Sequence, residues 1–360
     1  MEIDMKEEVN NFIMVCFTIV ISSCYCYVTT KLVRKGIIRF LLFFPVLYLL
    51  YNLPLYLKAL IFNVPIAFFV IWLTPFKLLQ LVFDTGPLSD PSLSFLHFVI
   101  ISCFPIKIHQ KPTSPKKPNG PNHTLTINIP FLKHYAIKGF IFLFLTILGY
   151  FKHIVPQMLK SFLICIYCYL ALEISLVVFA VIARILLGID TDHPFDHPYL
   201  STSFQDFWGR RWNRVASSCL KSTIFYPILD RASRILGRKW AAVVALVVTF
   251  VVSDVMHEII FYYMDRVRFG WGLPTLFIFQ GICVVIESTI KKKIKAKWRL
   301  PQRVIGPLIF VFNVISFMWL ILPELLEHRV DDRVLGEYVA LAEYIRTWAY
   351  WAWNGPTLCK

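Results

Sequence analysis

The chain has 360 residues, of which 57% are hydrophobic and only 16% are charged. A soluble protein of this length needs more polar surface, so the composition excludes an ordinary soluble enzyme and indicates a multi-pass membrane protein. The net charge of +15 is divided among loops between apolar segments. That distribution is typical of the cytosolic side of a membrane protein, and it argues against nucleic-acid binding.

Apolar segments long enough to cross a bilayer as helices, which takes about 20 residues, recur along the whole chain. The candidates are 11–29, 37–57, 64–83, 136–151, 158–183, 240–263, 272–290, 304–322 and 337–352. The segment 93–104 is too short to cross easily and is expected to be interfacial or re-entrant. The runs are too long for barrel strands, so we expect an all-α fold with about eight or nine transmembrane helices. No repeat or separate soluble domain interrupts it, which predicts one membrane domain over residues 1–360.

The charges of the loops predict which side of the membrane each loop faces. The N-terminal segment MEIDMKEEVN and the segment 323–332 are acidic and should be lumenal, and the first apolar run should be retained because a signal peptide begins with positive charge. The sequon at Asn122 lies in a predicted cytosolic loop, so no glycan is expected there. Basic, cytosolic segments are expected at 31–39, 105–135, 184–239 and 291–299.

The segment 184–239 is the longest polar stretch in the second half of the chain. Within it, STSFQDFW has helix-capping residues followed by an aromatic stripe at helical spacing, which predicts a basic amphipathic helix at the bilayer surface. Arginine binds phosphate and stacks on rings, so this helix is also suited to an anionic, adenine-containing substrate such as acyl-CoA. Interfacial anchoring remains the alternative. The substrate-binding candidates are Trp208, Arg210, Arg211, Trp212 and Arg214.

Two other patterns have the residue types of metal or redox sites but are interpreted structurally. His193, Asp196 and His197 lie in a loop in which proline follows both histidines, and no fourth ligand is evident, so we expect a hydrogen-bonding role and no metal. The sequence CIYC at 165–168 lies within an apolar helix, where free cysteine packs as a small hydrophobic residue.

The stretch SDVMHEII at 253–260 places ionisable side chains inside an apolar segment, which is by default a sign of function. Residues three and four apart share a helix face, so Asp254 and Ser253 are expected beside His257 and either could orient its ring. Glu258 points about 100° away. A neutral histidine is the natural general base near pH 7, although a histidine that only joins two helices is the alternative.

Two stretches together, HPFDHPYLSTSFQDFWGRRWN and SDVMHEIIFYY, resemble the plant wax synthase-like family of the membrane-bound O-acyltransferase superfamily. The segments at 76–89, 103–108 and 297–308 are similar to that family as well, so the resemblance covers nearly the whole chain. In the superfamily an asparagine or aspartate follows an aromatic block and an intramembrane histidine lies downstream. Asn213 and His257 occupy these places here, whereas Asp254 stands where a small residue is usual.

The resemblance implies a helical bundle that encloses a cavity for lipid and acyl-CoA. It implies acyl transfer from acyl-CoA, as a co-substrate, to a long-chain alcohol, which yields a wax ester with no cofactor. The hydrophobic substrates and the retained first span suggest the endoplasmic reticulum membrane. In this reading His257 accepts the alcohol proton, Asn213 stabilises the developing oxyanion, and Ser253 and Asp254 orient His257.

The alternatives are an acetyl-CoA-dependent transferase acting on diacylglycerol or sterol, and a transporter or scaffold. One difficulty is the depth of His257 in the membrane. If its helix is straight and starts at Trp240 on the cytosolic side, His257 lies roughly 25 Å along it, nearer the lumenal end.

Overall fold

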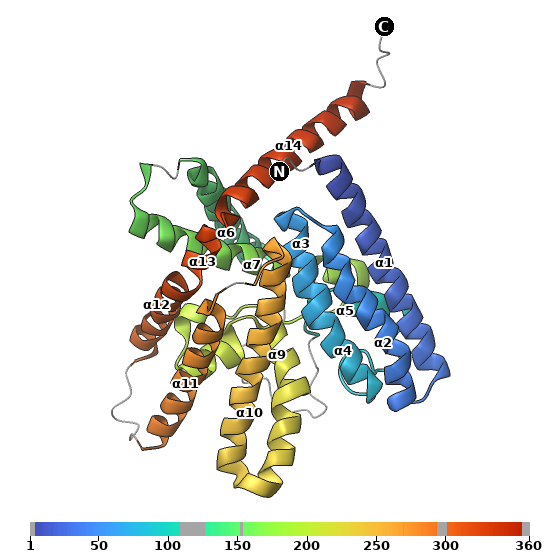
Figure 1. Ribbon diagram of the computed structural model, residues 1–360, viewed down its shortest axis with the longest axis vertical. Coiled ribbons are helices and arrows are strands. Elements are labelled where there is room, and N and C mark those ends of the chain that lie inside the picture. Colours follow the sequence, from blue (N-terminus) through green and yellow to red (C-terminus); the bar gives the residue numbers. More distant parts are fainter. Residues whose placement is uncertain (1–3, 109–126, 152–153, 269, 294–300, 355–360) are drawn as a thin grey trace.

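The computed structural model describes residues 4–108, 127–151, 154–268, 270–293 and 301–354, and within these ranges it forms helices and no strand (Figure 1). The sequon at Asn122 and most of the basic run 291–299 lie outside the described residues. An isolated bridge pairs Ile108 with Thr191. The longer helices are α1 (Met5–Leu32), α2 (Ile37–Asn52), α6 (Ile129–Tyr150), α7 (Gln157–Leu187), α10 (Tyr226–Asp265), α11 (Gly272–Lys293), α12 (Gln302–Leu320) and α14 (Val330–Asn354). The shorter ones are α3 (Leu60–Ile66), α4 (Thr74–Val82), α5 (Phe95–Cys103), α8 (Phe204–Asp206), α9 (Arg214–Leu220) and α13 (Leu322–Glu327).

Eight segments of the described chain are long and apolar enough to cross a membrane, which agrees with the lower of the two predicted numbers. They are Met5–Leu32, Ile37–Tyr56, Leu60–Val82, Ile129–Tyr150, Gln157–Leu187, Arg214–Asp265, Gly272–Lys291 and Arg303–Leu320. The predicted span at 337–352 is not among them. It lies in α14, whose charged residues break the apolar run and which projects from the bundle (Figure 1).

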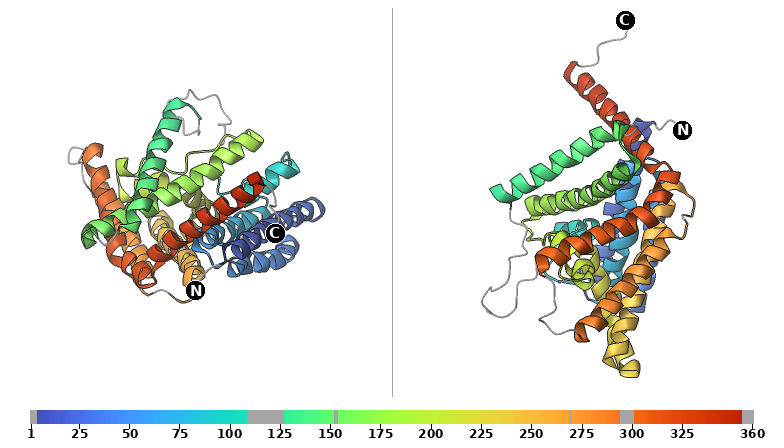
Figure 2. Two further views of the ribbon diagram at one scale, coloured as in Figure 1. Left: turned by 90° about the horizontal axis from the view of Figure 1, so that it is seen from above. Right: turned by 90° about the vertical axis from the view of Figure 1, so that its left-hand side faces the viewer.

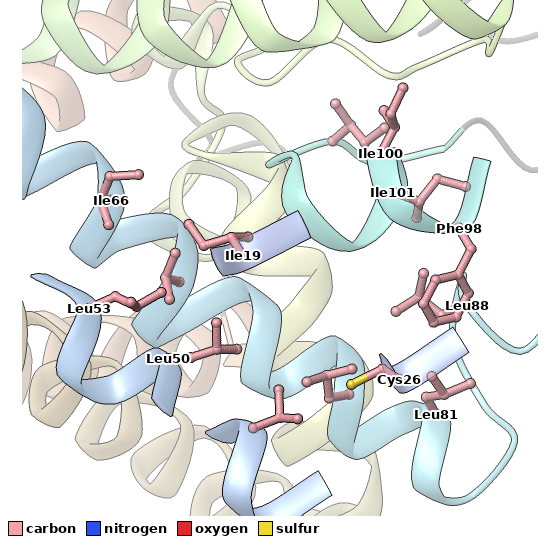
Figure 3. Close-up of a cluster of buried hydrophobic side chains, with 14 of the residues drawn as sticks. Ile19, Cys26, Leu50, Leu53, Ile66, Leu81, Leu88, Phe98, Ile100 and Ile101 are labelled. Carbon is pink, nitrogen blue, oxygen red and sulfur yellow. The ribbon is translucent and has the colours of Figure 1, made fainter. Parts of the chain in front are cut away.

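The first helices pack into one layer around a buried apolar cluster that includes Ile19, Leu50, Leu53 and Leu81 (Figure 3). Against this layer lies α5, whose nine residues confirm that 93–104 is too short to cross the membrane. The buried amine of Lys77 holds the C-terminal end of α5, because it donates hydrogen bonds to the carbonyl oxygens of Ile101 and Phe104 at 2.7 and 2.6 Å. The carbonyl groups that end this short helix inside the protein are thereby satisfied.

Carboxylates from the two ends of the chain meet at the start of α3. Glu8 of α1 accepts hydrogen bonds from the backbone N–H groups of Lys58 and Ala59, each at 3.0 Å, and Glu337 of α14 accepts one from Ile61 at 3.0 Å. Carboxylates suit this place because the first N–H groups of a helix have no partner within it. The acidic N-terminal segment and the last helix therefore lie at the same end of the bundle (Figure 1).

The segment from Asn213 to Asp265 forms a helical hairpin, and this hairpin brings Asn213 to the depth of His257. The chain runs away from Asn213 through α9, turns at Gly237 and returns along the rest of α10 (Figure 1). Gly237 has φ 70° and ψ 156°, a conformation open in practice only to glycine. Each arm spans 20 to 24 residues, or about 30–36 Å of helix, so Asn213 and His257 come to a similar depth.

The helices α6 and α7 lie side by side and flank the bundle (Figure 2). Lys138 of α6 and Glu173 of α7 join them by an ion pair of 2.5 Å, and Tyr135 donates a hydrogen bond to the same carboxylate at 3.3 Å. Cys165 and Cys168 lie in α7 as free thiols, in agreement with their assignment to packing.

Candidate active site

Three π-helical segments lie around the region that contains Asn213 and His257. They are η2 (Ala67–Leu73), η5 (Phe207–Arg211) and η6 (Lys221–Phe225). A π-helical turn inserts an extra residue and re-aims the side chains that follow, and such turns are frequent at functional sites. Here η2 carries Trp72, η5 carries Trp208 and η6 leads into α10. The sequence gives no periodicity signal for them.

His257 lies on α10 between two aromatic rings. Its ring centroid is 5.0 Å from that of Trp72 on η2 and 4.7 Å from that of Phe277 on α11. Its Nδ1 lies 2.6 Å from the backbone carbonyl oxygen of Ser253, one turn earlier. A carbonyl can only accept, so Nδ1 carries the proton and the lone pair of neutral His257 is on Nε2. The local geometry thus presents Nε2 as the basic nitrogen.

The two residues predicted to orient His257 are placed differently from expectation. Ser253 acts through its backbone carbonyl and not through its hydroxyl. Among the described residues no hydrogen bond joins Asp254 to His257; Asp254 instead lines a separate pocket of about 360 Å³ together with Glu258, Tyr262 and Arg268. The helical face that carries Asp254 is therefore directed away from the ring that it was expected to hold.

Asn213 begins α9 in the left-handed conformation, with φ 33° and ψ 69°. It is buried, and its Oδ1 accepts a hydrogen bond from the backbone N–H of Ala216 at 3.1 Å, which caps the helix. Its amide nitrogen makes no hydrogen bond with another described residue. The cap thus fixes the side chain by its oxygen and leaves an N–H₂ donor available at the N-terminus of a helix.

One apolar cluster connects the surroundings of Asn213 and His257. Val215 and Ala216 of α9 are buried in it together with Ile260 and Tyr263 of α10 and Trp72 of η2. Trp72 touches the imidazole, and Ala216 is the residue that Asn213 caps. Residues 213 and 257 are therefore linked through one packed unit, although 44 positions separate them in the sequence.

The aromatic block upstream of Asn213 is part of this core and is not a lipid-facing stripe. The ring of Trp212 stacks on Phe207 and on Tyr169 of α7, at centroid distances of 5.4 and 5.6 Å. Trp208 donates from Nε1 to Oε1 of Gln280 on α11 at 3.3 Å. The predicted amphipathic surface helix is therefore wrong. The chain is instead broken into α8, η5 and α9, since a π-turn and the left-handed Asn213 interrupt the helical spacing.

The capping residues of STSFQDFW behave as the sequence indicates. The hydroxyl of Ser203 accepts from the backbone N–H of Asp206 at 2.9 Å, and Asp206 accepts from the N–H of Thr202 at 3.0 Å. Arg211 donates from Nε to the Asp206 carboxylate at 2.8 Å. Burial raises the pKa of Asp206, but the hydrogen bonds from Thr202 and Arg211 outweigh burial and leave that pKa below its usual value.

Two of the three predicted phosphate-binding arginines are used inside the protein. Arg211 pairs with Asp206 and also donates to the carbonyl oxygen of Asp196 at 3.0 Å. Arg214 is buried against Asp192 at 3.2 Å. Both therefore hold the loop of residues 192–197 to the aromatic block, because a buried charge needs a paired partner. Arg210 is exposed and forms no ion pair with a described residue, so it alone of the three can meet an anion directly.

The histidine-containing loop is held to the aromatic block by backbone hydrogen bonds. The backbone N–H of Asp196 donates to the carbonyl of Arg211 at 3.0 Å, and that of Arg214 to the carbonyl of Pro194 at 2.7 Å. His197 Nδ1 lies 2.7 Å from the hydroxyl of Tyr199. Burial and the charge of Arg214 lower the pKa of His193. In the described parts of the chain no three His, Cys, Asp or Glu side chains gather as metal ligands.

The residues that enclose the histidine were not predicted from the sequence. Trp72 and Phe277 form its ring contacts, and Gln280 holds Trp208. Trp72 and Phe277 lie in apolar runs where an aromatic residue is ordinary. Gln280 is the stronger signal, since an amide in the middle of an apolar span needs partners.

The site thus combines, in a polytopic helical protein, a histidine between two aromatic rings with an amide donor at a helix N-terminus. The family described as membrane bound O-acyl transferase matches residues 192–280, which contain both Asn213 and His257. The chain is 36% identical to the long-chain-alcohol O-fatty-acyltransferase of Simmondsia chinensis over 342 residues, 95% of this chain and 97% of that one. It is 37% identical to the acyl-CoA–sterol O-acyltransferase 1 of Arabidopsis thaliana over 337 residues, 93% and 96% of the two chains. The chain belongs to the membrane-bound O-acyltransferase family and is an integral membrane enzyme.

Proposed function

We propose that this enzyme transfers a fatty acyl group from acyl-CoA to the hydroxyl of a long-chain alcohol and so forms a wax ester. The observation that carries the proposal is the hydrogen bond from Nδ1 of His257 to the carbonyl of Ser253, which leaves Nε2 as a base on a ring that lies between those of Trp72 and Phe277. The first-named relative acts on long-chain alcohols by its name, and it matches almost the whole chain.

In this mechanism the alcohol O–H donates to Nε2 of His257 as its oxygen attacks the thioester carbonyl carbon. The proton moves to Nε2, and a C–O bond forms to give a tetrahedral intermediate. Its oxyanion accepts a hydrogen bond from the amide nitrogen of Asn213. The intermediate collapses as the C–S bond breaks, and the CoA thiolate takes the proton from Nε2. In this mechanism every bond and proton is accounted for without a covalent acyl-enzyme, a metal or a cofactor.

The exposed side chain of Arg210 is assigned to the phosphates of acyl-CoA, since it has no partner in the described protein and lies three residues before Asn213. Trp208 and Trp212 contact each other in the aromatic block beside it. Arg211 and Arg214 contribute by holding the loop of residues 192–197.

The proposed location is the endoplasmic reticulum membrane with a lumenal N-terminus. The acidic start of α1 and the acidic segment around α13 lie at one end of the bundle, and the basic α1–α2 turn and Gly237 hairpin lie at the other (Figure 1). A cytosolic position for the basic end agrees with the distribution of positive charge in membrane proteins.

A second candidate acceptor is a sterol. The relative named for acyl-CoA–sterol transfer is as similar to this chain as the relative named for long-chain alcohols. The chemistry at His257 is the same for either hydroxyl. Transfer of acetyl groups to diacylglycerol or sterol is a more distant alternative.

The test is expression in yeast that lacks neutral-lipid synthesis, fed with a long-chain alcohol, followed by lipid profiling. Wax esters are the expected product. If the strain makes only steryl esters, the acceptor is a sterol. If it makes only acetylated glycerides, the enzyme uses acetyl-CoA. The absence of any ester would contradict the proposal.

A further inference from the structure

Gln280 of α11 is a buried amide, and one of its two polar atoms has no hydrogen-bond partner among the described residues. Its side chain is 1% exposed. Oε1 accepts a hydrogen bond from Nε1 of Trp208 at 3.3 Å, whereas Nε2 has no partner among the described residues. Buried amide donors are nearly always paired, so this one needs an explanation.

The orientation of the amide follows from the chemistry of its partner. An indole N–H is only a donor, so the atom facing Trp208 has to be the oxygen of Gln280. A flipped amide would point its N–H₂ group at another donor and lose this bond. The unpaired atom is therefore the nitrogen, which offers two protons and can bind only an acceptor.

The position of Gln280 places this donor between the histidine and the aromatic block. Phe277 lies one helical turn earlier on the same face of α11 and contacts the ring of His257. Phe250 of α10 lies within 6.3 Å of the Trp208 ring, centroid to centroid, and Gly281 approaches Phe250 closely. These contacts tie Gln280 to the same packed unit as His257.

We propose that Nε2 of Gln280 donates a hydrogen bond to the carbonyl oxygen of the bound acyl thioester, beside the amide of Asn213. The inference rests on the proposed function, because that oxygen is the acceptor that the reaction brings into the site. The oxygen gains negative charge as the alcohol attacks, and two fixed donors stabilise it more than one. Trp208 holds the amide by its oxygen, so the donor is in place before the substrate arrives.

The central variant is Gln280→Met, which keeps the length and apolar volume of the side chain and removes both polar atoms. The matched control is Gln80→Met. Gln80 is also a buried glutamine within a span, but its Nε2 is already bonded to Ser222 at 2.7 Å. Both variants are assayed in detergent-solubilised full-length protein for kcat, for KM and for thermal stability.

Two unreactive analogues separate a substrate contact from a structural role. A ketone analogue of acyl-CoA, with CH₂ in place of the thioester sulfur, keeps the carbonyl, and a thioether analogue lacks it. Gln280→Met should lower kcat by about 100- to 1000-fold. It should weaken binding of the ketone analogue by about tenfold and leave binding of the thioether analogue unchanged. Gln80→Met should lower thermal stability with little change in kcat.

Several results would overturn the inference. One is wild-type kcat in Gln280→Met, and another is equal weakening of both analogues, which means that Gln280 only supports Trp208. If the wild-type enzyme forms no ester with any acceptor, the proposed function fails. Binding of the two analogues still reports whether Gln280 contacts the carbonyl oxygen in that case, so the two failures are distinguishable.

Discussion

The Nδ1–H group of His257 donates to the carbonyl oxygen of Ser253, at 2.6 Å and one turn earlier in the same helix. This bond uses a backbone atom, so no side chain is needed to fix the tautomer. It also explains why Asp254 is free to line a different pocket. Ser253→Ala should therefore leave kcat within a few-fold of wild type, because the carbonyl remains. A kcat loss as large as that of a His257 variant would mean that the hydroxyl, and not the carbonyl, orients the ring.

Asn213 caps α9 and is proposed to donate to the oxyanion, and substitutions can separate these two functions. Asn213→Asp keeps an oxygen to cap α9 but removes the amide donor, so kcat should fall by about 100- to 1000-fold with thermal stability preserved. Asn213→Ala removes the cap as well and should also cost about 0.5–2 kcal/mol of stability. The checks are kcat and thermal unfolding of both variants in detergent. Wild-type kcat in Asn213→Asp would exclude the amide as an oxyanion donor.

Arg210 and Arg211 are neighbours with different expected phenotypes. Arg210→Ala should raise KM for acyl-CoA several-fold and leave stability unchanged, because the side chain is exposed. The same variant should not change KM for acyl-pantetheine, which lacks the nucleotide. Arg231→Ala, an exposed arginine in the helical hairpin, serves as the control. An Arg210→Ala enzyme that is equally impaired with acyl-pantetheine would contradict the phosphate contact.

The Asp206 carboxylate should make stability depend on pH in a defined direction. Its folded pKa is lowered by the hydrogen bonds from Thr202 and Arg211, despite the opposing effect of burial. A lowered folded pKa contributes stability above the unfolded pKa of about 3.9, and that contribution is lost as pH falls through the folded pKa. Asp206→Asn should thus be less stable than wild type at pH 7.

Below the folded pKa of Asp206 the difference between Asp206→Asn and wild type should shrink, which thermal unfolding across acidic pH measures. A constant difference at all pH values would show that the carboxylate charge is not what matters.

Gly237 lets two helices join into the hairpin that brings Asn213 and His257 to one depth. Gly237→Ala should cost about 1–3 kcal/mol, because an L-residue is strained at this φ and ψ. Gly336→Ala is the control: Gly336 lies within α14 with open space at its Cβ position, so alanine there should be neutral or mildly stabilising. Equal stability of the two variants would contradict the strained turn.

The fold class and most spans follow from hydropathy alone, because a span needs a long apolar run. The hairpin at Gly237 was not predicted, since a glycine within a continuous helical pattern gives no sign of a reversal. Hydropathy also led to the wrong prediction of a membrane span at 337–352, where charged residues such as Glu337 lie among the aromatic residues.

The site was predictable in part for a similar reason. His257 stands out because an ionisable group in an apolar run is costly, and the resemblance to the family indicated Asn213. The ion pair of Arg214 with Asp192 and the hydrogen bond of Arg211 to the carbonyl of Asp196 could not be predicted, because their partners come from a loop more than ten residues away. The ring contacts of His257 come from two elements, η2 and α11, that are separated from it and from each other by long stretches of chain. Nothing local in the sequence specifies that packing.

The most direct test of the account is ester formation by His257→Ala, compared with His97→Ala, whose ring contacts Ser94 at the start of α5. General base catalysis raises reaction rates by about 100- to 10,000-fold. At a normal protein level, the rate of wax ester synthesis by His257→Ala should therefore fall by a factor in this range or a larger one. His97→Ala should retain it. Unchanged ester output from His257→Ala would contradict the catalytic assignment.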